Sequence, residues 1–168
     1  QRINIYPRMT VFQNVQVALI ARHNQHLNFF TQAHNLYKGD TEDLLELVDL
    51  SGETGGIAGE LAYGKQKQLE LAIALAANPQ MLLLDEPTAG MSPSETTESI
   101  RLINSIAESR SLTLLFTEHD MSVVFSIADR ISVLHHGQIL ASGSPDEVRN
   151  DSEVKKVYLG EGVDDASA

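Results

Sequence analysis

No cysteine occurs among the 168 residues of this chain. Disulfide bonds and thiolate metal sites are therefore excluded, and the composition fits a reducing compartment. No apolar run approaches the roughly 20 residues that a membrane-spanning helix requires. The chain starts with Gln1-Arg2-Ile3-Asn4, which offers neither an initiator methionine nor the beginning of a signal peptide. We expect from this start that the chain was cut from a longer protein.

Positive charge is scarce as well. The 12 Lys and Arg residues stand against 23 Asp and Glu residues, which gives a formal net charge of −11. Proteins that hold the phosphate backbone of nucleic acids usually show a basic face, so we expect no nucleic-acid partner. The same charge argues against direct binding to anionic lipid. Hydrophobic residues make up 42% of the chain, an ordinary share for a globular domain that buries a core.

The predicted elements are helical first and then alternate with strands. Apolar periodicity and capping residues predict five helices, at residues 9–22, 41–50, 62–77, 92–110 and 120–128, with a sixth starting at Ser144. Thr10 with Gln13, and Ser92 with Glu95, have the spacing of capping boxes, and the residue after Ser92 is a proline, which suits the first helical position. Short apolar runs predict strands at 81–84, 112–117, 130–134 and 139–141. We expect the strand at 81–84 to be buried on both faces, as in parallel sheets. The alternation predicts an α/β fold with a mainly parallel sheet and flanking helices.

Two carboxylates, Asp85 and Glu86, follow directly after the apolar run at 81–84. Ligands of open α/β sheets bind at the carboxyl ends of the strands. An aspartate there suits Mg²⁺, which prefers oxygen ligands, and a following glutamate suits the activation of a water for attack on a phosphoryl group. Pro87 would stop the strand. The alternative is a solvated Asp-Glu turn after a core strand.

Two further segments point to the same chemistry. Residues 61–66 read Leu-Ala-Tyr-Gly-Lys-Gln at a predicted helix start, where free amides and the helix dipole favour anions and Gly64 lets a phosphate approach the backbone. The apolar run at 112–117 ends in Glu118 and His119, and a neutral imidazole can donate a hydrogen bond to a developing phosphate charge. The alternatives are a tight helix entry for the first segment and a structural histidine for the second.

Together these segments resemble the nucleotide-binding domain of ATP-binding-cassette (ABC) transporters. Residues 61–66 are similar to the signature motif, 82–86 to Walker B with its catalytic glutamate, 89–93 to the D-loop, His119 to the switch histidine and Gln1 to the Q-loop glutamine. The resemblance implies part of a P-loop NTPase fold, ATP and Mg²⁺ as ligands, and catalytic roles for Glu86 and His119. It further implies metal ligation by Asp85 and Gln1. The residues that it implies in nucleotide binding are Gln1, Ala62, Tyr63, Gly64, Lys65 and Gln66.

The variant signature, the stretch Ala89-Gly90-Met91-Ser92-Pro93 and the ending at 157–161 resemble the ATPase subunits of branched-chain amino acid importers, with importers of urea and short amides also similar. Two departures stand out, because the family usually has serine where Ala62 stands and often aspartate where Ser92 stands. The resemblance implies a head-to-tail dimer with a second nucleotide-binding domain. It also implies transmembrane permease subunits, an indirect link to a periplasmic or extracellular substrate-binding protein, and a peripheral location on the cytoplasmic face of the membrane.

The sequence contains no Gly-x-x-x-x-Gly-Lys-Ser/Thr, the loop that cradles the β- and γ-phosphates in this family. We therefore expect this chain alone neither to bind ATP tightly nor to hydrolyse it, although the intact parent would be an ATPase. Two alternatives remain. The chain could be a non-catalytic fragment that lends its signature face to a partner ATPase, or a cassette ATPase outside transport.

The same resemblance predicts how the chain is organised. Residues of about 9–77 would form the helical subdomain with the signature helix, about 78–160 would belong to the α/β core, and 161–168 would be an acidic tail. We also expect that, without a phosphate-loop segment, an apolar edge or face of the sheet is left uncovered.

Overall fold

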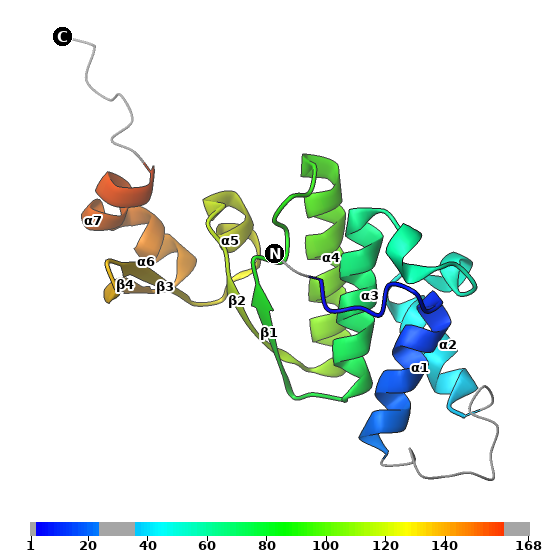
Figure 1. The fold of residues 1–168 in the computed structure, drawn as a ribbon. Coiled ribbons are helices and arrows are strands. Elements are labelled where there is room, and N and C mark those ends of the chain that lie inside the picture. The colour runs from blue at the N-terminus through cyan, green and yellow to red at the C-terminus, as the bar shows by residue number, and fades with distance from the viewer. Residues whose placement is uncertain (1–2, 24–35, 160–168) are drawn as a thin grey trace. The chain divides into compact units, whose positions relative to one another are not determined.

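A computed structural model describes residues 3–23 and 36–159, and the chain divides into two compact units, residues 1–117 and 118–168 (Figure 1). Each unit has its own buried core. Within the described ranges, no helix combines the length and the apolar character needed to cross a membrane. The predicted boundary near residue 77, between a helical subdomain and the α/β core, is not tested by this division and stays a prediction. The predicted acidic tail lies outside the described residues.

Three helices form the start of the first unit: α1 (Val11–Arg22), α2 (Lys38–Leu47) and α3 (Tyr63–Ala76). The predicted capping box of α1 is confirmed. The Gln13 amide donates to the Thr10 hydroxyl over 3.1 Å, and the Thr10 amide donates to the Gln13 side chain over 3.0 Å. Both bonds satisfy amides that a helix start otherwise leaves without partners.

The helix predicted at 41–50 begins and ends three residues earlier, so its predicted bounds are wrong. Asp49 has a positive φ of 58°, which stops the helix after its last turn. The Leu50 amide then donates back to the Leu45 carbonyl over 2.8 Å, so that Leu50 reaches the core from outside the helix. Two short 3₁₀ turns, η3 (Ser51–Glu53) and η4 (Ala58–Glu60), lie between α2 and α3.

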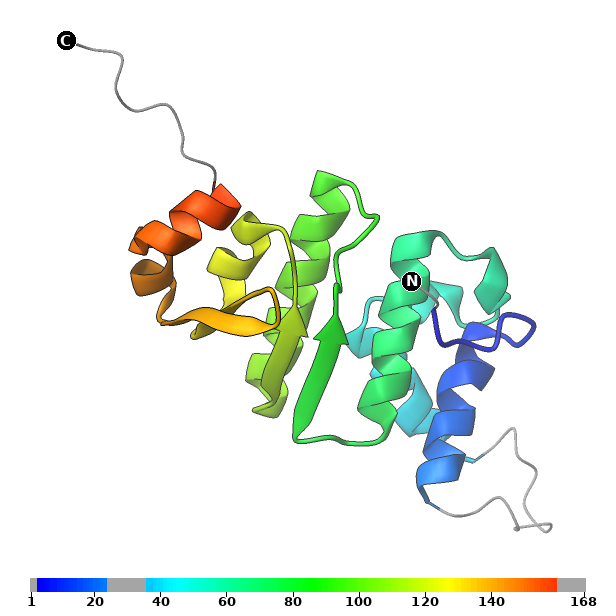
Figure 2. The same ribbon diagram turned by 60° about the vertical axis from the view of Figure 1, so that its left-hand side comes forward.

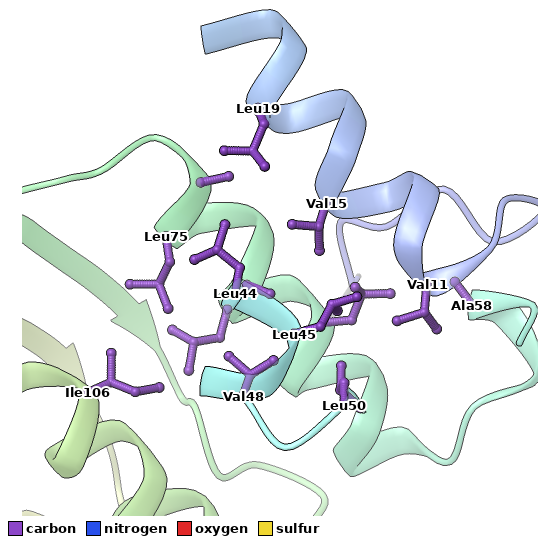
Figure 3. Packing of buried hydrophobic residues seen from close by; sticks show 14 of the residues in the cluster. Val11, Val15, Leu19, Leu44, Leu45, Val48, Leu50, Ala58, Leu75 and Ile106 are labelled. Atoms are coloured by element: carbon purple, nitrogen blue, oxygen red, sulfur yellow. The ribbon is translucent and has the colours of Figure 1, made fainter. Parts of the chain in front are cut away.

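The core of the first unit lies where α1, α2 and α3 meet (Figure 3). Val11, Val15 and Leu19 point from α1 toward Leu44 and Leu45 of α2. The buried face of α3 completes this core with residues Leu69, Leu71, Ala72, Leu75 and Ala76. Burying an aliphatic side chain of this size contributes about 1.5–3 kcal/mol, so this helical packing contributes substantially to the stability of the unit.

The sheet of the first unit has two parallel strands, β1 (Met81–Asp85) and β2 (Thr113–Thr117). They are joined by α4 (Pro93–Arg110), which has the predicted cap at Ser92 and proline at the first helical position. In Figure 2, α4 runs behind both strands, and α3 lies beside β1. This strand–helix–strand unit confirms the α/β class with parallel strands.

The prediction that the strand at 81–84 is buried on both faces is wrong. Leu82 is 5% exposed, but Met81 and Leu83 are 46% and 71% exposed, and Leu115 of β2 is 55% exposed. Side chains alternate between the faces of a sheet, and α4 covers only the face to which Leu82 belongs. Within the described residues of the first unit, no helix covers the other face. We call this exposed side the open face of the sheet.

The second unit is built around an antiparallel hairpin of β3 (Ile131–His135) and β4 (Gln138–Gly143). His136 and Gly137 at its turn have φ angles of 49° and 77°, which is the geometry of a two-residue hairpin turn. The hairpin is accompanied by α5 (Met121–Ile127), α6 (Pro145–Asn150), α7 (Ser152–Val154) and the π turn η5 (Lys155–Leu159). The buried apolar residues of this unit are Val123, Val124, Ile131, Val133, Val148 and Val154.

The open face yields a testable prediction. Replacing Leu83 and Leu115 together by Thr removes exposed apolar surface but keeps residues that favour strands, so self-association should fall while the free energy of unfolding changes by only about 0.5 kcal/mol per site. Leu82→Thr is the matched control, because Leu82 is buried and its loss should cost about 2–4 kcal/mol. Light scattering and chemical unfolding measure the two effects. Equal destabilisation at both faces would contradict the assignment of an open face.

Candidate functional site

The first part of the candidate site lies at the carboxyl ends of β1 and β2. Asp85 and Thr117 are the last residues of their strands and stand opposite each other in the register. The Thr117 hydroxyl donates to the Asp85 carboxylate, and the Glu86 amide donates to the Thr117 carbonyl over 3.0 Å. Asp85 shares the open face with Leu83, because side chains two residues apart point to the same side. The open face of the sheet therefore ends in a carboxylate and a hydroxyl.

Glu86 has an unusual backbone conformation, with a positive φ of 44°. This region is sterically unfavourable for residues other than glycine, asparagine and aspartate, and residues held in it cluster at functional sites. The chain then passes through two turns, in which the amides of Ala89 and Met91 donate to the carbonyls of Glu86 and Thr88 over 3.2 Å each. This conformation could not be predicted from the sequence, because glutamate has no preference for it.

The second part of the candidate site is the start of α3. Ala62 is the cap residue, yet its side chain cannot accept a hydrogen bond from the first turn. The first backbone bond of the helix runs from the Gln66 amide to the Ala62 carbonyl over 3.0 Å. The amides of Tyr63, Gly64 and Lys65 therefore precede the helical ladder and have no intrahelical acceptor. Such a helix end suits a phosphate.

Two of the predicted binding side chains are turned onto the chain itself. The Lys65 ammonium forms an ion pair with the Glu53 carboxylate of η3. The Gln66 side chain donates to the Leu61 carbonyl over 2.9 Å and so fixes the entry to α3. Sequence reasoning missed the first contact, because Glu53 lies 12 residues before Lys65 in a separate turn.

The structure brings the start of α3 together with the loop that follows Glu86. Gly90 in that loop has a φ of 78°, and a Cβ added to it would lie 3.6 Å from the Tyr63 ring. A Cβ added to Gly64 would lie 3.6 Å from the Glu95 carboxylate, near the start of α4. The predicted signature and D-loop segments are thus neighbours within the first unit.

Glu95 closes the capping box of α4. The Ser92 amide and hydroxyl donate to one of its carboxylate oxygens over 2.8 and 2.7 Å. These bonds from Ser92, the side-chain bond first, hold the pKa of Glu95 below its ordinary value, so the carboxylate is charged at neutral pH. The sequence revealed this cap but not the nearness of Glu95 to Gly64.

The chain before α1 is tied to the turn that leads into α3. The Gly59 amide donates to the Pro7 carbonyl, and the Ala58 amide donates to the Met9 carbonyl, over 3.0 Å each. A Cβ on Gly59 would come within 2.8 Å of the Pro7 carbonyl oxygen, so only glycine allows this close approach. The buried side chain of Asn14 holds the same segment at Tyr6. Its oxygen accepts a hydrogen bond from the Tyr6 amide, and its nitrogen donates one to the Tyr6 carbonyl.

The structure does not place two of the predicted site residues, His119 and Gln1, relative to this arrangement. His119 belongs to the second unit, where its imidazole is 73% exposed and lies 3.9 Å from the Glu118 carboxylate. The next residue, Asp120, caps α5, and hydrogen bonds from Ser122 hold its pKa below the ordinary value. Gln1 lies outside the described residues. The roles of Gln1 and His119, and their meeting with Asp85 and Glu86, stay predictions.

A known protein family matches the part of the chain that holds the start of α3 and Glu86. The family model described as ABC transporter matches residues 1–89, which include the start of α3, all of β1 and Glu86. The chain belongs to the ABC transporter family. A second model, described as branched-chain amino acid ATP-binding cassette transporter, matches residues 138–164. The resemblance predicted from the motifs is therefore confirmed.

Curated members of the ABC transporter family are similar along nearly the whole chain. The high-affinity branched-chain amino acid transport ATP-binding protein BraF of Pseudomonas aeruginosa is 37% identical over 172 residues, covering 96% of this chain and 66% of its own length. The corresponding protein LivG of Escherichia coli is 36% identical over 171 residues, with the same coverage. This chain thus spans about two-thirds of the length of the curated relatives that it matches.

A solved ABC transporter structure has the same fold. The ADP conformation of MJ1267, an ATP-binding cassette of an ABC transporter, superposes with a TM-score of 0.75 at 30% identity, covering 92% of this chain and 64% of that one. This likeness confirms the predicted fold class of part of an ABC ATPase domain.

The backbone at Glu86 yields a second prediction. Glu86→Gly and Glu86→Ala both remove the side chain and its contacts, but only glycine adopts a positive φ without steric cost. We expect the glycine variant to unfold with a free energy about 1 kcal/mol higher than that of the alanine variant. Urea unfolding of the pair measures the difference. If alanine proves as stable as glycine, Glu86 does not hold a strained conformation.

Proposed function

We propose that this chain is part of the ATP-binding and ATP-hydrolysing subunit of an ABC importer, with branched-chain amino acids or related amides as the transported cargo. The observation that carries the proposal is the closeness of the start of α3 to the loop after Glu86, next to the segment that the ABC transporter family model matches. The match of residues 138–164 to the branched-chain amino acid family supports the cargo class, as do the names of BraF and LivG.

In the proposed dimer, ATP binds between the phosphate loop of one domain and the signature segment of the other. The amides of Tyr63, Gly64 and Lys65 would meet the terminal phosphate, because they have no acceptor within the helix and no side-chain cap precedes them. Ala62 has no hydroxyl for this contact, so the backbone amides carry it. Gln66 would act indirectly, by holding the helix entry through Leu61.

Asp85 fits a magnesium site, because its carboxylate and the Thr117 hydroxyl place oxygen donors together at the end of the sheet. Mg²⁺ bound to the nucleotide would offset the phosphate charge. Asp85 would hold it with Gln1 as a further ligand. Glu86 follows in the strained turn and would orient and deprotonate the attacking water, and His119 would donate a hydrogen bond to the γ-phosphate.

The proposal includes partners that the chain would meet as a transporter subunit. These are a second nucleotide-binding domain, membrane-embedded permease subunits and, through them, an external substrate-binding protein. The subunit would lie on the cytoplasmic face of the membrane. Closure of the dimer on ATP would be a ligand-driven population shift, because the signature amides contact the nucleotide only in the closed state.

The catalytic role of Glu86 gives a third prediction. In a chimera that places the first third of LivG before Gln1, Glu86→Gln should slow ATP hydrolysis by about 10²–10⁴-fold, because it removes the general base, while ATP binding persists. Phosphate release and calorimetric titration measure the two properties. Glu108→Gln on the exposed side of α4 is the control and should hydrolyse ATP at the unmodified rate. Unchanged turnover in the Glu86 variant would place the base elsewhere.

A second candidate function is that the chain lends its signature face to a partner that has the phosphate loop. It is favoured by the start of α3, where the amides of Tyr63, Gly64 and Lys65 have no acceptor within the helix. A cassette ATPase outside transport has no observation in its favour here.

Mixing tests this second candidate. The chain would be added to a cassette ATPase subunit that keeps its phosphate loop but has a disabled signature, and restored hydrolysis is expected. Gly64→Asp should abolish the restoration, because its charge would repel the phosphate at the amide end of α3. Gly55→Asp is the matched control, because Gly55 faces open space. If the mixture stays inactive, or if both variants behave alike, the chain does not act in this way.

A further inference from the structure

Two carboxylates lie at the start of α3, and the proposed mechanism uses neither. Glu53 of η3 pairs with the Lys65 ammonium. Glu95 of α4 places its Oε1 atom 3.6 Å from where a Cβ on Gly64 would stand. Glu95 therefore adjoins the amide end that would receive a phosphate, and Glu53 neutralises the ammonium of a residue in the first turn of α3.

The charges at this helix end do not favour an anion as they stand. A helix start carries about half a positive charge, and Lys65 adds one more. Glu53 and Glu95 together contribute two negative charges. The sum is slightly negative, whereas a helix end that binds phosphate readily presents positive charge. The amide donors are thus in place while the electrostatic attraction is cancelled.

The two carboxylates differ in how firmly they are held. The Lys65–Glu53 pair is exposed, with 46% and 35% of the two side chains accessible, and so exposed a pair is weak and easily exchanged. A lysine stem is flexible enough to carry its ammonium to another anion. Glu95, by contrast, is anchored through its Oε2 atom to the amide and hydroxyl of Ser92. One negative charge can therefore lose its partner to a ligand, and the other stays in place.

We propose that Glu53 and Glu95 set the anion affinity of the signature segment, and that a polyphosphate binds there by drawing Lys65 away from Glu53 against the fixed charge of Glu95. This inference rests on the proposed function, because it concerns the affinity of the same signature site. The two carboxylates would give the isolated signature segment a low affinity for phosphate. Binding there would become favourable when other groups, such as a partner's phosphate loop, share the ligand.

The test uses the 168-residue chain and sodium pyrophosphate as the probe, with the Gly64 amide and the Lys65 ammonium followed by NMR at neutral pH and low salt. Glu53→Gln and Glu95→Gln each remove one charge, and glutamine also serves in a capping box, so the start of α4 should persist. Each variant should bind pyrophosphate about threefold more tightly than the unmodified chain, and the double variant about tenfold. Added salt should shrink these differences.

Glu147→Gln is the matched control. Glu147 closes an equivalent capping box with Ser144 at the start of α6, in the other unit, so its variant should bind pyrophosphate like the unmodified chain. Thermal melts of all variants report whether the folds are intact. In the unmodified chain, the Lys65 ammonium signal should shift as pyrophosphate binds, which a merely structural ion pair would not show.

The outcomes separate this inference from the proposed function. Tighter binding at Gly64 in both charge variants, with a moving Lys65 signal, supports the inference. Equal affinity at Gly64 in all variants overturns the inference but leaves the signature assignment standing. No shift at Gly64 in any variant, the double variant included, overturns the inference and also counts against the signature assignment.

Discussion

The burial of one face of α3 is the constraint on which the first unit depends. Leu69, Ala72 and Leu75 pack into the core that α1 and α2 provide, and this fixes the rotation and the direction of the helix. Because that face is buried, the opposite side and the amide end at Gly64 are left outside the core. The same helix adjoins α4 and the loop after Glu86, so a single apolar interface sets the position of both halves of the candidate site.

Local signals explain what could be predicted from the sequence. Thr10 with Gln13 and Ser92 with Glu95 define helix starts through contacts three residues apart, and both capping boxes form as expected. The apolar run before Asp85 likewise forms a strand that ends at the predicted carboxylate. Sequence also identified the family, because several short motifs occur in the right order.

What the sequence could not reveal depends on contacts between distant residues. Lys65 was expected to face a nucleotide, but it forms an ion pair with Glu53. Nothing in the sequence of either segment predicts this pair. The continuous apolar sequence of β1 suggested burial on both faces. Burial depends on which elements cover the sheet, however, and α4 covers only one of its faces. The positive φ of Glu86 belongs to the turn that follows β1, and it runs against the conformational preference of glutamate.

Three features of the site lower stability or attraction, and they occur together. The open face of the sheet exposes Leu83 and Leu115, Glu86 sits in an unfavourable backbone conformation, and carboxylates cancel the charge at the start of α3. The first two features cost free energy in the isolated chain, and the third weakens the attraction for an anion. The helical core can tolerate this cost because its own packing does not involve the open face.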